Sequence, residues 1–432
     1  KTIYCKIQYT LVTFNGSGFD NFFLMDEATK MGMVDSIFMA SGRILNYKLK
    51  GGHDSWDLNK FIACSLDRAC ECFKSCPIKQ KGFDHSLPQK AYDANSTKGV
   101  CDWLTSLDGE PIIEHISGVT RAFVPNLSVE YNKCDVLATL DVMQKYRNAC
   151  DTILGADPVD YMTIGSMTYK VWQKQNKFET VAPDNQSDDK QIRRSMVAGR
   201  TQCYFGKQHF KLVTRFVDYC SMYPHVMTAE QNRFPVGKYT KTDKYVEGKK
   251  GIYYCNIKHQ RAKWVNPEEI KKSFATIDKE TLDRIPECDR KYAPVIVPRR
   301  AKLSNGEADN TKALDWSYRG KQTGVYLTSV DYEMIKKYAG EDAVEVTPGW
   351  RGKDGEKTEH VGIYWEEDTN ELFKDFLGGL AKEKNRQDDL KKEKSPEYND
   401  AIREGSKLSS NSLSGKVAQR AFEDTSKFLK TS

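Results

Sequence analysis

The sequence has no run of about 18 apolar residues, so it offers no segment that could cross a membrane as a helix. It also lacks a framework of paired cysteine spacings, because its twelve cysteines are scattered. In a chain of 432 residues this pattern indicates reduced thiols and an intracellular, reducing location such as the cytoplasm, nucleus or mitochondrion. Cys70, Cys72 and Cys76 have no fourth cysteine or histidine at finger spacing, which favours ordinary thiols over a zinc site.

Charge is unevenly distributed along the chain. The net charge is +6, but residues 190–300 contain 24 Lys plus Arg and 11 Asp plus Glu, a net charge of +13, so the remainder carries −7. A basic middle of this kind fits a polyanion such as nucleic acid. A merely solvated basic surface explains the charge alone equally well.

Periodicity and turn signals predict a mixed α/β chain of at least two domains. Residues 3–14 alternate as a strand and end in the turn Asn15-Gly16-Ser17-Gly18. The polar stretch 183–190 predicts a break and a domain boundary. Further strands are expected over 36–39, 43–49, 201–217, 251–257, 293–298 and 324–327. Helices are expected over 20–30, 57–73, 126–146 and 331–338, with a helical hairpin over 371–411.

Two motifs carry chemistry. Asp218-Tyr219-Cys220-Ser221-Met222-Tyr223-Pro224 follows an apolar, β-branched run and places one carboxylate at a predicted strand end, where side chains can converge on a metal ion. Lys407, Asn411 and Gly415 are spaced along the second predicted helix of the hairpin.

These motifs resemble the first palm motif, D-x-x-S-x-Y-P, and the fingers motif, K-x-x-x-N-S-x-Y-G, of family B DNA polymerases, in the family order. The long gap between them implies an insertion, as in protein-primed members of the family. Lys384 falls where a second triphosphate-binding lysine is expected. Gly199 and Arg200 fall where the family places a linker that contacts template DNA.

The N-terminal part carries a second resemblance. Asn15-Gly16-Ser17-Gly18-Phe19-Asp20 is similar to the second 3′–5′ exonuclease motif, and Tyr131-Asn132-Lys133-Cys134-Asp135 to the third, Y-x-x-x-D. Positions i and i+4 share a helix face, so Tyr131 can orient a water molecule beside the metal ligand Asp135. The resemblance also assigns contacts with the single-stranded 3′ end to Asn15, Ser65, Leu66 and Lys81.

The resemblance implies template-directed nucleotidyl transfer with proofreading. The substrates would be primer–template DNA and deoxynucleoside triphosphates, with a terminal priming protein as partner and no membrane. Two Mg²⁺ (or Mn²⁺) ions would act in each active site of the complete enzyme. The implied metal ligands are Asp218, the Tyr219 carbonyl, Asp20 and Asp135.

The implied nucleotide contacts come mainly from the fingers. Lys384 and Lys407 would neutralise the triphosphate, and Asn411 would face the base and sugar. Tyr223, from the palm motif, would form the floor of the sugar-binding site and exclude a 2′-hydroxyl. Gly415 would lie close to DNA.

The expected fold is α/β and α+β in several domains. Residues 1–185 would form an RNase-H-like exonuclease domain. Residues 190–240 and 324–370 would form part of the palm, residues 241–323 the subfamily insertion, and residues 371–425 the fingers.

Two family motifs are absent. Residues 1–14 contain no Asp or Glu, although a D-x-E motif should precede Asn15, and no D-T-D motif follows Gly415. The sequence therefore resembles an internal fragment without the rest of the palm and the thumb, which we expect to be inactive or nearly so by itself. In addition, Ser414 stands where the family usually has tyrosine.

Other functions stay open at this point. One alternative is a catalytically inactive polymerase remnant that binds single-stranded DNA through its basic middle. The intact Asp218, Lys407 and Asn411 favour the polymerase. A standalone exonuclease leaves the fingers hairpin unexplained.

Overall fold

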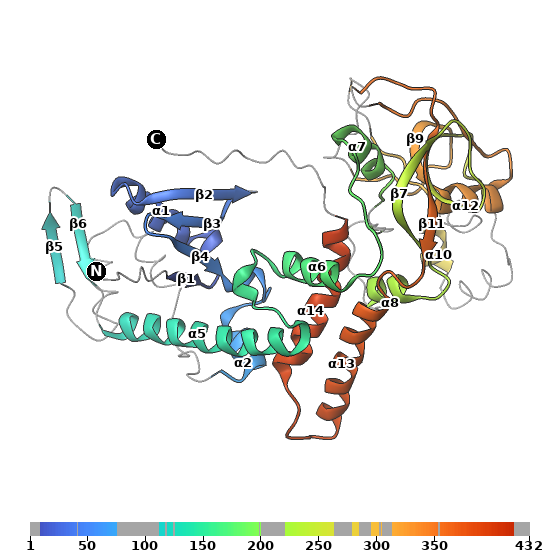
Figure 1. The fold of residues 1–432 in the computed structure, drawn as a ribbon. Coiled ribbons are helices and arrows are strands. Elements are labelled where there is room, and N and C mark those ends of the chain that lie inside the picture. Colours follow the sequence, from blue (N-terminus) through green and yellow to red (C-terminus); the bar gives the residue numbers. More distant parts are fainter. Residues whose placement is uncertain are drawn as a thin grey trace, which may run out of the picture. The chain divides into compact units, whose positions relative to one another are not determined.

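The structure is a computed structural model. It describes residues 9–40, 42–75, 112–116, 119–123, 126–197, 199, 221–262, 279–284, 295–301, 304, 313–352 and 355–418. The chain divides into two compact units (Figure 1). Unit 1 contains the described residues up to Gln175 together with Asp375–Ala418, and unit 2 contains those of Asn176–Lys374.

Unit 1 is built on a four-stranded sheet of order β1-β4-β3-β2. The strands are β1 (Thr10–Thr13), β2 (Val34–Ala40), β3 (Arg43–Leu49) and β4 (His53–Asp57). β1 runs parallel to β4, and the other neighbours are antiparallel. α1 (Asp20–Lys30) packs on the strands through Met25, which is buried with Val34, Ile44 and Tyr47. A separate hairpin joins β5 (Ile112–Ile116) to β6 (Val119–Phe123).

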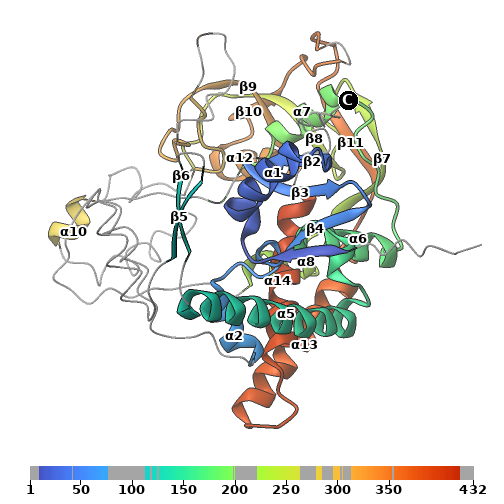
Figure 2. The same ribbon diagram turned by 90° about the vertical axis from the view of Figure 1, so that its left-hand side faces the viewer.

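The long helix α5 (Asn126–Leu154) lies on the other side of the strands from α1 (Figures 1 and 2). Its fully buried Tyr146 meets Phe61 and Phe73 edge to face, each with ring centroids 6.1 Å apart. Phe61 in turn packs against Trp56 of β4. Phe73 belongs to α2 (Leu66–Phe73), so these aromatic rings tie α2 and α5 to the sheet.

A buried carboxylate shapes the turn before α1. Asp57 is 2% exposed and accepts the backbone N–H groups of Asn15, Ser17 and Asn59 at 2.8, 3.0 and 3.0 Å. The turn at 15–18 and the helix at 20–30 are thereby confirmed, with η1 (Gly16–Gly18) forming the turn.

The single helix expected over 57–73 is wrong. Asp57 ends β4, η2 (Leu58–Lys60) follows, and α2 starts only after Ser65. The physical reason is that Asp57 and Ser65 use their side chains to accept backbone N–H groups, which starts new elements at both positions.

The predicted helical hairpin is confirmed as α13 (Lys374–Lys392) and α14 (Asp400–Val417), the red helices of Figure 1. α14 contacts α5, α2 and α6 (Ile164–Gln175). The buried residues of α14 are mostly small: Ala401, Gly405, Ser406, Ser409, Ser410 and Leu413. At Gly405 an added Cβ would lie 3.0 Å from the Ile153 Cδ1 atom, so any larger residue there would require Ile153 to shift, which shows how closely α14 approaches α5.

Unit 2 is built on a five-stranded antiparallel sheet in which β8 pairs with β9, β10 and β11, and β11 pairs with β7. The strands are β7 (Phe234–Thr242), β8 (Lys250–Ile257), β9 (Gln322–Thr328), β10 (Val344–Val346) and β11 (Gly362–Thr369). β8 lies in the predicted insertion, yet it shares a sheet with β9 and β11 of the predicted palm. The division into palm and insertion stays a prediction.

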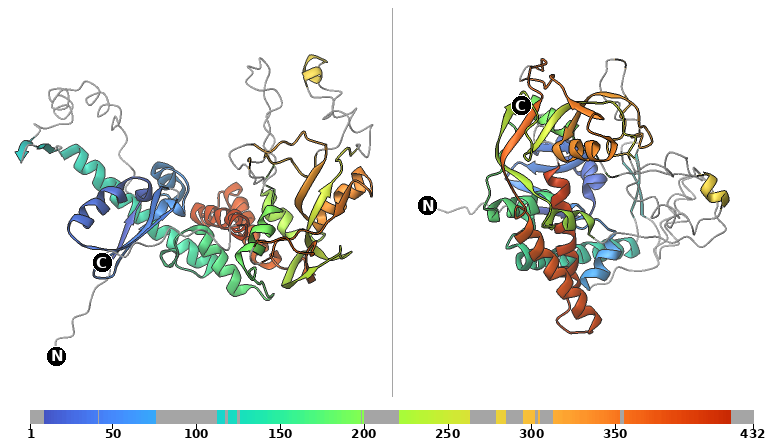
Figure 3. Two further views of the ribbon diagram at one scale, coloured as in Figure 1. Left: turned by 90° about the horizontal axis from the view of Figure 1, so that it is seen from above. Right: turned by 90° about the vertical axis from the view of Figure 1, so that its right-hand side faces the viewer.

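Alternating side chains give this sheet two covered faces. Tyr253, Cys255 and Ile257 of β8 pack with Ile335 of α12 (Ser329–Ala339), seen beside the sheet in Figure 3. Ile252 of β8 faces the other way, into a cluster with Tyr326, Trp350 and Ile363 that also contacts Ile192 of α7 (Gln186–Arg194). This period of two is what half-buried strands require. The short helices α8 (Met222–Thr228) and α10 (Lys279–Arg284) complete the described elements of this unit.

Two further local expectations are wrong. The polar break predicted at 183–190 is wrong in its second part: residues 183–185 lie outside helices and strands, but α7 starts at Gln186, because Asn185 accepts the Asp188 N–H at 2.9 Å and caps the helix. A strand at 293–298 is absent from the described residues 295–298. There the Val297 N–H and carbonyl bond to the side chain of Gln260 instead of to a neighbouring strand.

The expected strands at 201–217 lie outside the described residues. Among the helices that are described, none combines the length and apolar character needed to cross a membrane. The mixed α/β fold class is confirmed, while its assignment to an RNase-H-like domain, palm and fingers stays a prediction.

Candidate functional site

One exposed face of α14 gathers the residues of the predicted fingers motif. Lys407, Asn411 and Gly415 are all exposed and stand four residues apart, so they lie along one side of the helix. Ser414 is half-buried beside them, and its hydroxyl donates to the Asn411 carbonyl at 2.9 Å. Because the opposite face of α14 is buried among helices, this face has a fixed direction and stays open to a ligand.

A chain of ion pairs connects the two predicted triphosphate-binding lysines. Lys384 Nζ lies 2.9 Å from Asp388 Oδ2, and Asp388 Oδ1 accepts from Arg403 Nε at 2.5 Å. Arg403 also pairs with Glu404, whose Oε2 lies 3.7 Å from Lys407 Nζ. The hydrogen bond from Lys384 lowers the pKa of Asp388, burial opposes it, and Arg403 adds to the lowering. These five groups carry a net charge of +1, so the network can still attract an anion.

The two lysines differ in their exposure and in how closely they pair with the carboxylates of this network. The Lys384 side chain is 26% exposed and held at hydrogen-bond distance, whereas Lys407 is 46% exposed and only loosely paired. Lys407 is therefore the easier of the two to transfer from its carboxylate to a phosphate.

The predicted exonuclease residues stand on separate elements of unit 1. Asp20 is the first residue of α1 and is exposed, and Asn15 just before it adopts a left-handed conformation with φ 64°. Tyr131 and Asp135 lie one turn apart on α5, as the Y-x-x-x-D spacing predicts, and Asp135 is half-buried. Their assignment to a metal or to DNA stays a prediction.

Ser65 and Leu66 have structural roles at the start of α2. The Ser65 hydroxyl accepts the Arg68 N–H at 3.2 Å and caps the helix, while Leu66 is 8% exposed and belongs to the core. Their predicted contacts with single-stranded DNA are not tested by these observations.

Tyr223 lies near the start of α8 in unit 2 and is 57% exposed. Ser221 precedes it in a left-handed conformation with φ 53°, which turns the chain into the helix. The Tyr223 hydroxyl approaches Gly199, at a position 3.5 Å from where a Cβ of that residue would stand. The structure therefore brings two predicted site residues together from two different segments.

Four predicted site residues lie outside the described part of the chain: Lys81, Arg200, Asp218 and Tyr219. Within the part that is described, no three His, Cys, Asp or Glu side chains are grouped so that they could hold a metal ion. The described residues alone therefore do not form a metal centre.

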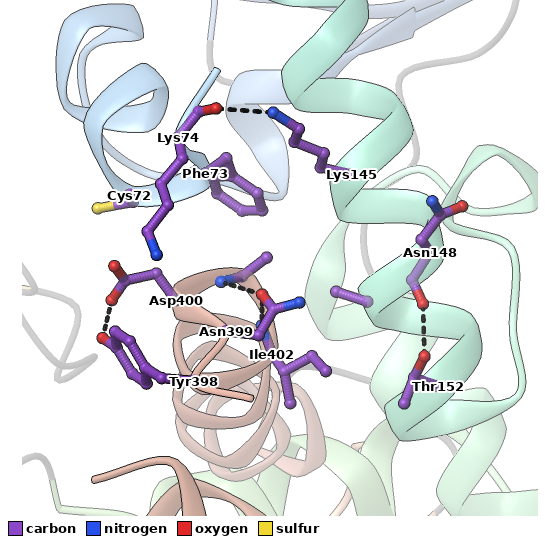
Figure 4. Close-up of a pocket in the computed structure, with 12 residues that line it drawn as sticks. Cys72, Phe73, Lys74, Lys145, Asn148, Thr152, Tyr398, Asn399, Asp400 and Ile402 are labelled. Carbon is purple, nitrogen blue, oxygen red and sulfur yellow. Dashed lines mark hydrogen bonds between the residues drawn. The ribbon is translucent and has the colours of Figure 1, made fainter. Parts of the chain in front are cut away.

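A cavity of about 310 Å³ lies in unit 1 where α14 begins, between α2 and α5 (Figure 4). Lys74 Nζ lies 5.6 Å from the centroid of the Tyr398 ring, and the Tyr398 hydroxyl donates to Asp400. Lys145 Nζ donates to the Lys74 carbonyl at 2.7 Å and pairs with Asp141 at 2.9 Å. The charged groups of this cavity thus have protein partners, and they anchor the hairpin to α2 and α5.

Sequence reasoning missed Asp388, Arg403 and the buried acid Asp188 of α7. Asp388 follows Lys384 by four residues, and an i, i+4 pair of opposite charge on a predicted helix is a signal that could have found it. The burial of Asp188 offered no such signal, because the partners that enclose it, Trp350, Tyr239 and Lys241, are distant in sequence.

A family model for "DNA polymerase type B, organellar and viral" matches residues 1–283. A search of curated proteins found no match. Among solved structures, the chain is similar to Phi29 DNA polymerase in its complex with primer–template DNA (TM-score 0.53, 16% identity), in an orthorhombic crystal form (0.55, 17%) and in its complex with single-stranded DNA (0.52, 16%). The aligned regions cover 95%, 95% and 96% of this chain, and 59% of the Phi29 chain in each case.

At these identities the solved structures show similarity of fold alone, and the chain spans about 59% of their length. The family model, by contrast, covers well over half of the chain. The chain belongs to the organellar and viral family of type B DNA polymerases.

Proposed function

We propose that this chain carries the nucleotide-binding face of a protein-primed family B DNA polymerase, which performs template-directed nucleotidyl transfer. The observation that carries the proposal is the α14 face, where Lys407, Asn411 and Gly415 are exposed in line. The similar Phi29 DNA polymerase has been solved with primer–template DNA and incoming nucleotide substrates. We take the same classes of ligand, deoxynucleoside triphosphates and primer–template DNA, as the ligands of this chain.

Charge and position support this assignment. Lys407 and Lys384 would each exchange a carboxylate partner for a triphosphate oxygen, and the triphosphate as a whole carries more negative charge than one carboxylate. Asn411, one turn beyond Lys407, would face the base and sugar. Catalysis in such a site depends mostly on positioning and on stabilising charge, which a helix fixed on its opposite face supplies.

The proposal assigns divalent metal ions to Asp218 and the Tyr219 carbonyl, both outside the described residues. Two Mg²⁺ ions, when bound, would activate the primer 3′-hydroxyl and stabilise the leaving pyrophosphate. Oxygen ligands suit this ion.

We also propose a 3′–5′ proofreading site in unit 1, with Asp20 and Asp135 as metal ligands and Tyr131 orienting the attacking water. Asn15, Ser65, Leu66 and Lys81 would hold the single-stranded 3′ end. A terminal priming protein is the proposed protein partner.

The test compares Lys407→Glu with Lys392→Glu, an exposed lysine of the same hairpin that pairs with Asp389. The chain is loaded with primer–template DNA and titrated with the templated deoxynucleoside triphosphate and Mg²⁺. Because a charged hydrogen bond contributes about 1.5–3 kcal/mol, we expect Lys407→Glu to weaken nucleotide binding at least about tenfold. Lys392→Glu should bind as the wild type does, and equal affinities for all three proteins would reject the assignment of α14.

A further inference from the structure

One buried side chain joins α13 to the turn that leads into α14, the two red helices of Figure 1. Gln387 is fully buried. Its Nε2 donates to Glu383 Oε1 at 2.9 Å, and its Oε1 accepts the Asn399 N–H at 2.8 Å. Turning the amide over would set a donor against the N–H and an acceptor against the carboxylate, so only one orientation satisfies both partners. The side chain is therefore fixed in direction as well as in place.

The carboxylate that accepts from Gln387 is itself held in place. Arg386 donates to Glu383 through Nε at 3.0 Å and through Nη2 at 2.9 Å. These bonds lower the pKa of Glu383, burial opposes the lowering, and the bond from Gln387 adds to it. Because the acceptor is ionised, the hydrogen bond from Gln387 is stronger than one between neutral groups.

Asn399 connects this anchor to α14. Its side-chain oxygen accepts the N–H groups of Ala401 and Ile402 at 2.9 and 3.3 Å, so it caps the helix (Figure 4). The backbone of the same residue donates to Gln387. The first turn of α14 is thereby tied to the last part of α13 through one residue.

The rest of α13 has few buried contacts to fix its position along the axis. All of its residues are described, and among them only Leu377, Leu380 and Gln387 are buried. Apolar contacts are non-directional, whereas a buried amide loses its partners when the helix slips. The packing of α14 on α5, α6 and α2 fixes that helix independently. Gln387 and the Asp388–Arg403 pair are thus the directional contacts that hold the C-terminal half of α13 against α14.

We propose that Gln387 is a positioning residue for the nucleotide-binding face: by fixing the register of α13 on α14, it sets where Lys384 stands relative to Lys407. Lys384 precedes Gln387 by less than one helical turn. A slip of α13 by one residue would move Lys384 by about 1.5 Å along the axis and turn it by about 100°. Such a shift is enough to break a hydrogen bond to a phosphate. This inference rests on the triphosphate-binding role proposed for the two lysines.

The first arm of the test needs no nucleotide. Spin labels are attached through p-acetylphenylalanine at the exposed positions Ala381 and Val417 of the full chain. Double electron–electron resonance then gives the distribution of distances between the two helices. Gln387→Met keeps the length of the side chain but removes its polar atoms, so it should shift or broaden this distribution.

Gln144→Met is the control for the first arm. It makes the same change at an exposed glutamine of α5, whose amide bonds Asn148 at 3.1 Å, and it should leave the distance distribution as in the wild type. A wild-type distribution in Gln387→Met, or an equal change in Gln144→Met, overturns the inference.

The second arm measures the dissociation constant of the templated deoxynucleoside triphosphate on DNA-loaded chain with Mg²⁺. Gln387→Met should weaken binding about two- to tenfold, the effect of one hydrogen bond. In a Lys384→Ala background the same substitution should change binding by less than about twofold, because Gln387 acts through Lys384. Equal losses in both backgrounds, or no loss in the wild-type background, overturn the inference. If the wild type binds no nucleotide, the proposed function fails, and the resonance arm alone decides whether Gln387 sets the register.

Discussion

Replacing Asp188 with alanine removes the buried carboxylate that joins α7 to the sheet of unit 2. The truncation leaves the indole N–H of Trp350, which is fully buried, and the Tyr239 hydroxyl without this acceptor. It also removes the partner of Lys241, whose Nζ lies 3.3 Å from the carboxylate. Lys241 is 33% exposed and can be solvated, so the cost comes mainly from the two donors left without an acceptor. Each contributes about 1–3 kcal/mol, and we expect the free energy of local unfolding of α7 and β7 to fall by about 3 kcal/mol.

Hydrogen exchange with mass spectrometry measures this loss directly on peptides that contain 186–194 and 234–242. A fall of 3 kcal/mol corresponds to exchange about a hundredfold faster, since each 1.4 kcal/mol is tenfold. Asp315→Ala is the control, because its carboxylate is 35% exposed and pairs with an exposed arginine, which contributes at most about 1 kcal/mol. Exchange of α7 within about threefold of the wild type in Asp188→Ala would refute the reasoning.

The same group predicts a pH dependence. Burial works to raise the pKa of Asp188, but hydrogen bonds from Trp350 and Tyr239, together with the Lys241 ammonium, hold it below its ordinary value. A carboxyl whose folded pKa is lowered contributes stability that is present above its unfolded pKa of about 3.9 and is lost as pH falls through the folded pKa. Protection of α7 should therefore lose this contribution only below about pH 4, and Asp188→Asn should lack that acid-dependent loss.

Two further perturbations test unit 1. Gly405→Val places a branched side chain where α14 meets α5. Overpacking of this kind should lower the free energy of unfolding, measured by urea titration, by about 1–3 kcal/mol. The control is Gly415→Ala, in open space, which should change this free energy little or raise it by about 0.5–1 kcal/mol. Similar losses for both glycines would contradict the tight packing of α14. Asp57→Ala removes the acceptor of three backbone N–H groups, so hydrogen exchange of the Asn15 and Ser17 amides should become at least about tenfold faster. Unchanged exchange would show that the carboxylate does not hold the turn.

Local signals in the sequence were enough for elements whose cause is local. Asp20–Lys30 forms α1 as expected because an acid begins it and Lys30 pairs with Asp26 and Glu27 at its end. The hairpin of α13 and α14 was predictable for the same reason, since its charged residues and its Asn399 cap lie within the segment.

The errors arose where distant residues decide the structure. The stretch at 183–190 looks like a loop because it is polar, yet Asp188 is buried by partners from β7 and from the loop around Trp350. Residues 295–298 look like a strand because they are apolar and β-branched, but the side chain of Gln260 takes their backbone bonds. No local pattern encodes either contact.

The candidate site divides in the same way. The alignment of Lys407, Asn411 and Gly415 follows from helical spacing and was predictable. The approach of Gly199 to Tyr223 and the pairing of Asp388 with Arg403 depend on tertiary packing, so the sequence could not give them.

Primer extension tests the proposed polymerase function most directly. A protein that contains this chain is supplied with primer–template DNA, deoxynucleoside triphosphates and Mg²⁺. The wild type is compared with Asp218→Asn and with the control Asp243→Asn, which changes an exposed carboxylate outside the proposed site. The wild type and Asp243→Asn should extend the primer, while Asp218→Asn should lose extension by at least about a thousandfold and keep its DNA affinity. Extension by Asp218→Asn at the wild-type rate would contradict the assignment of the palm carboxylate, and with it the proposed function.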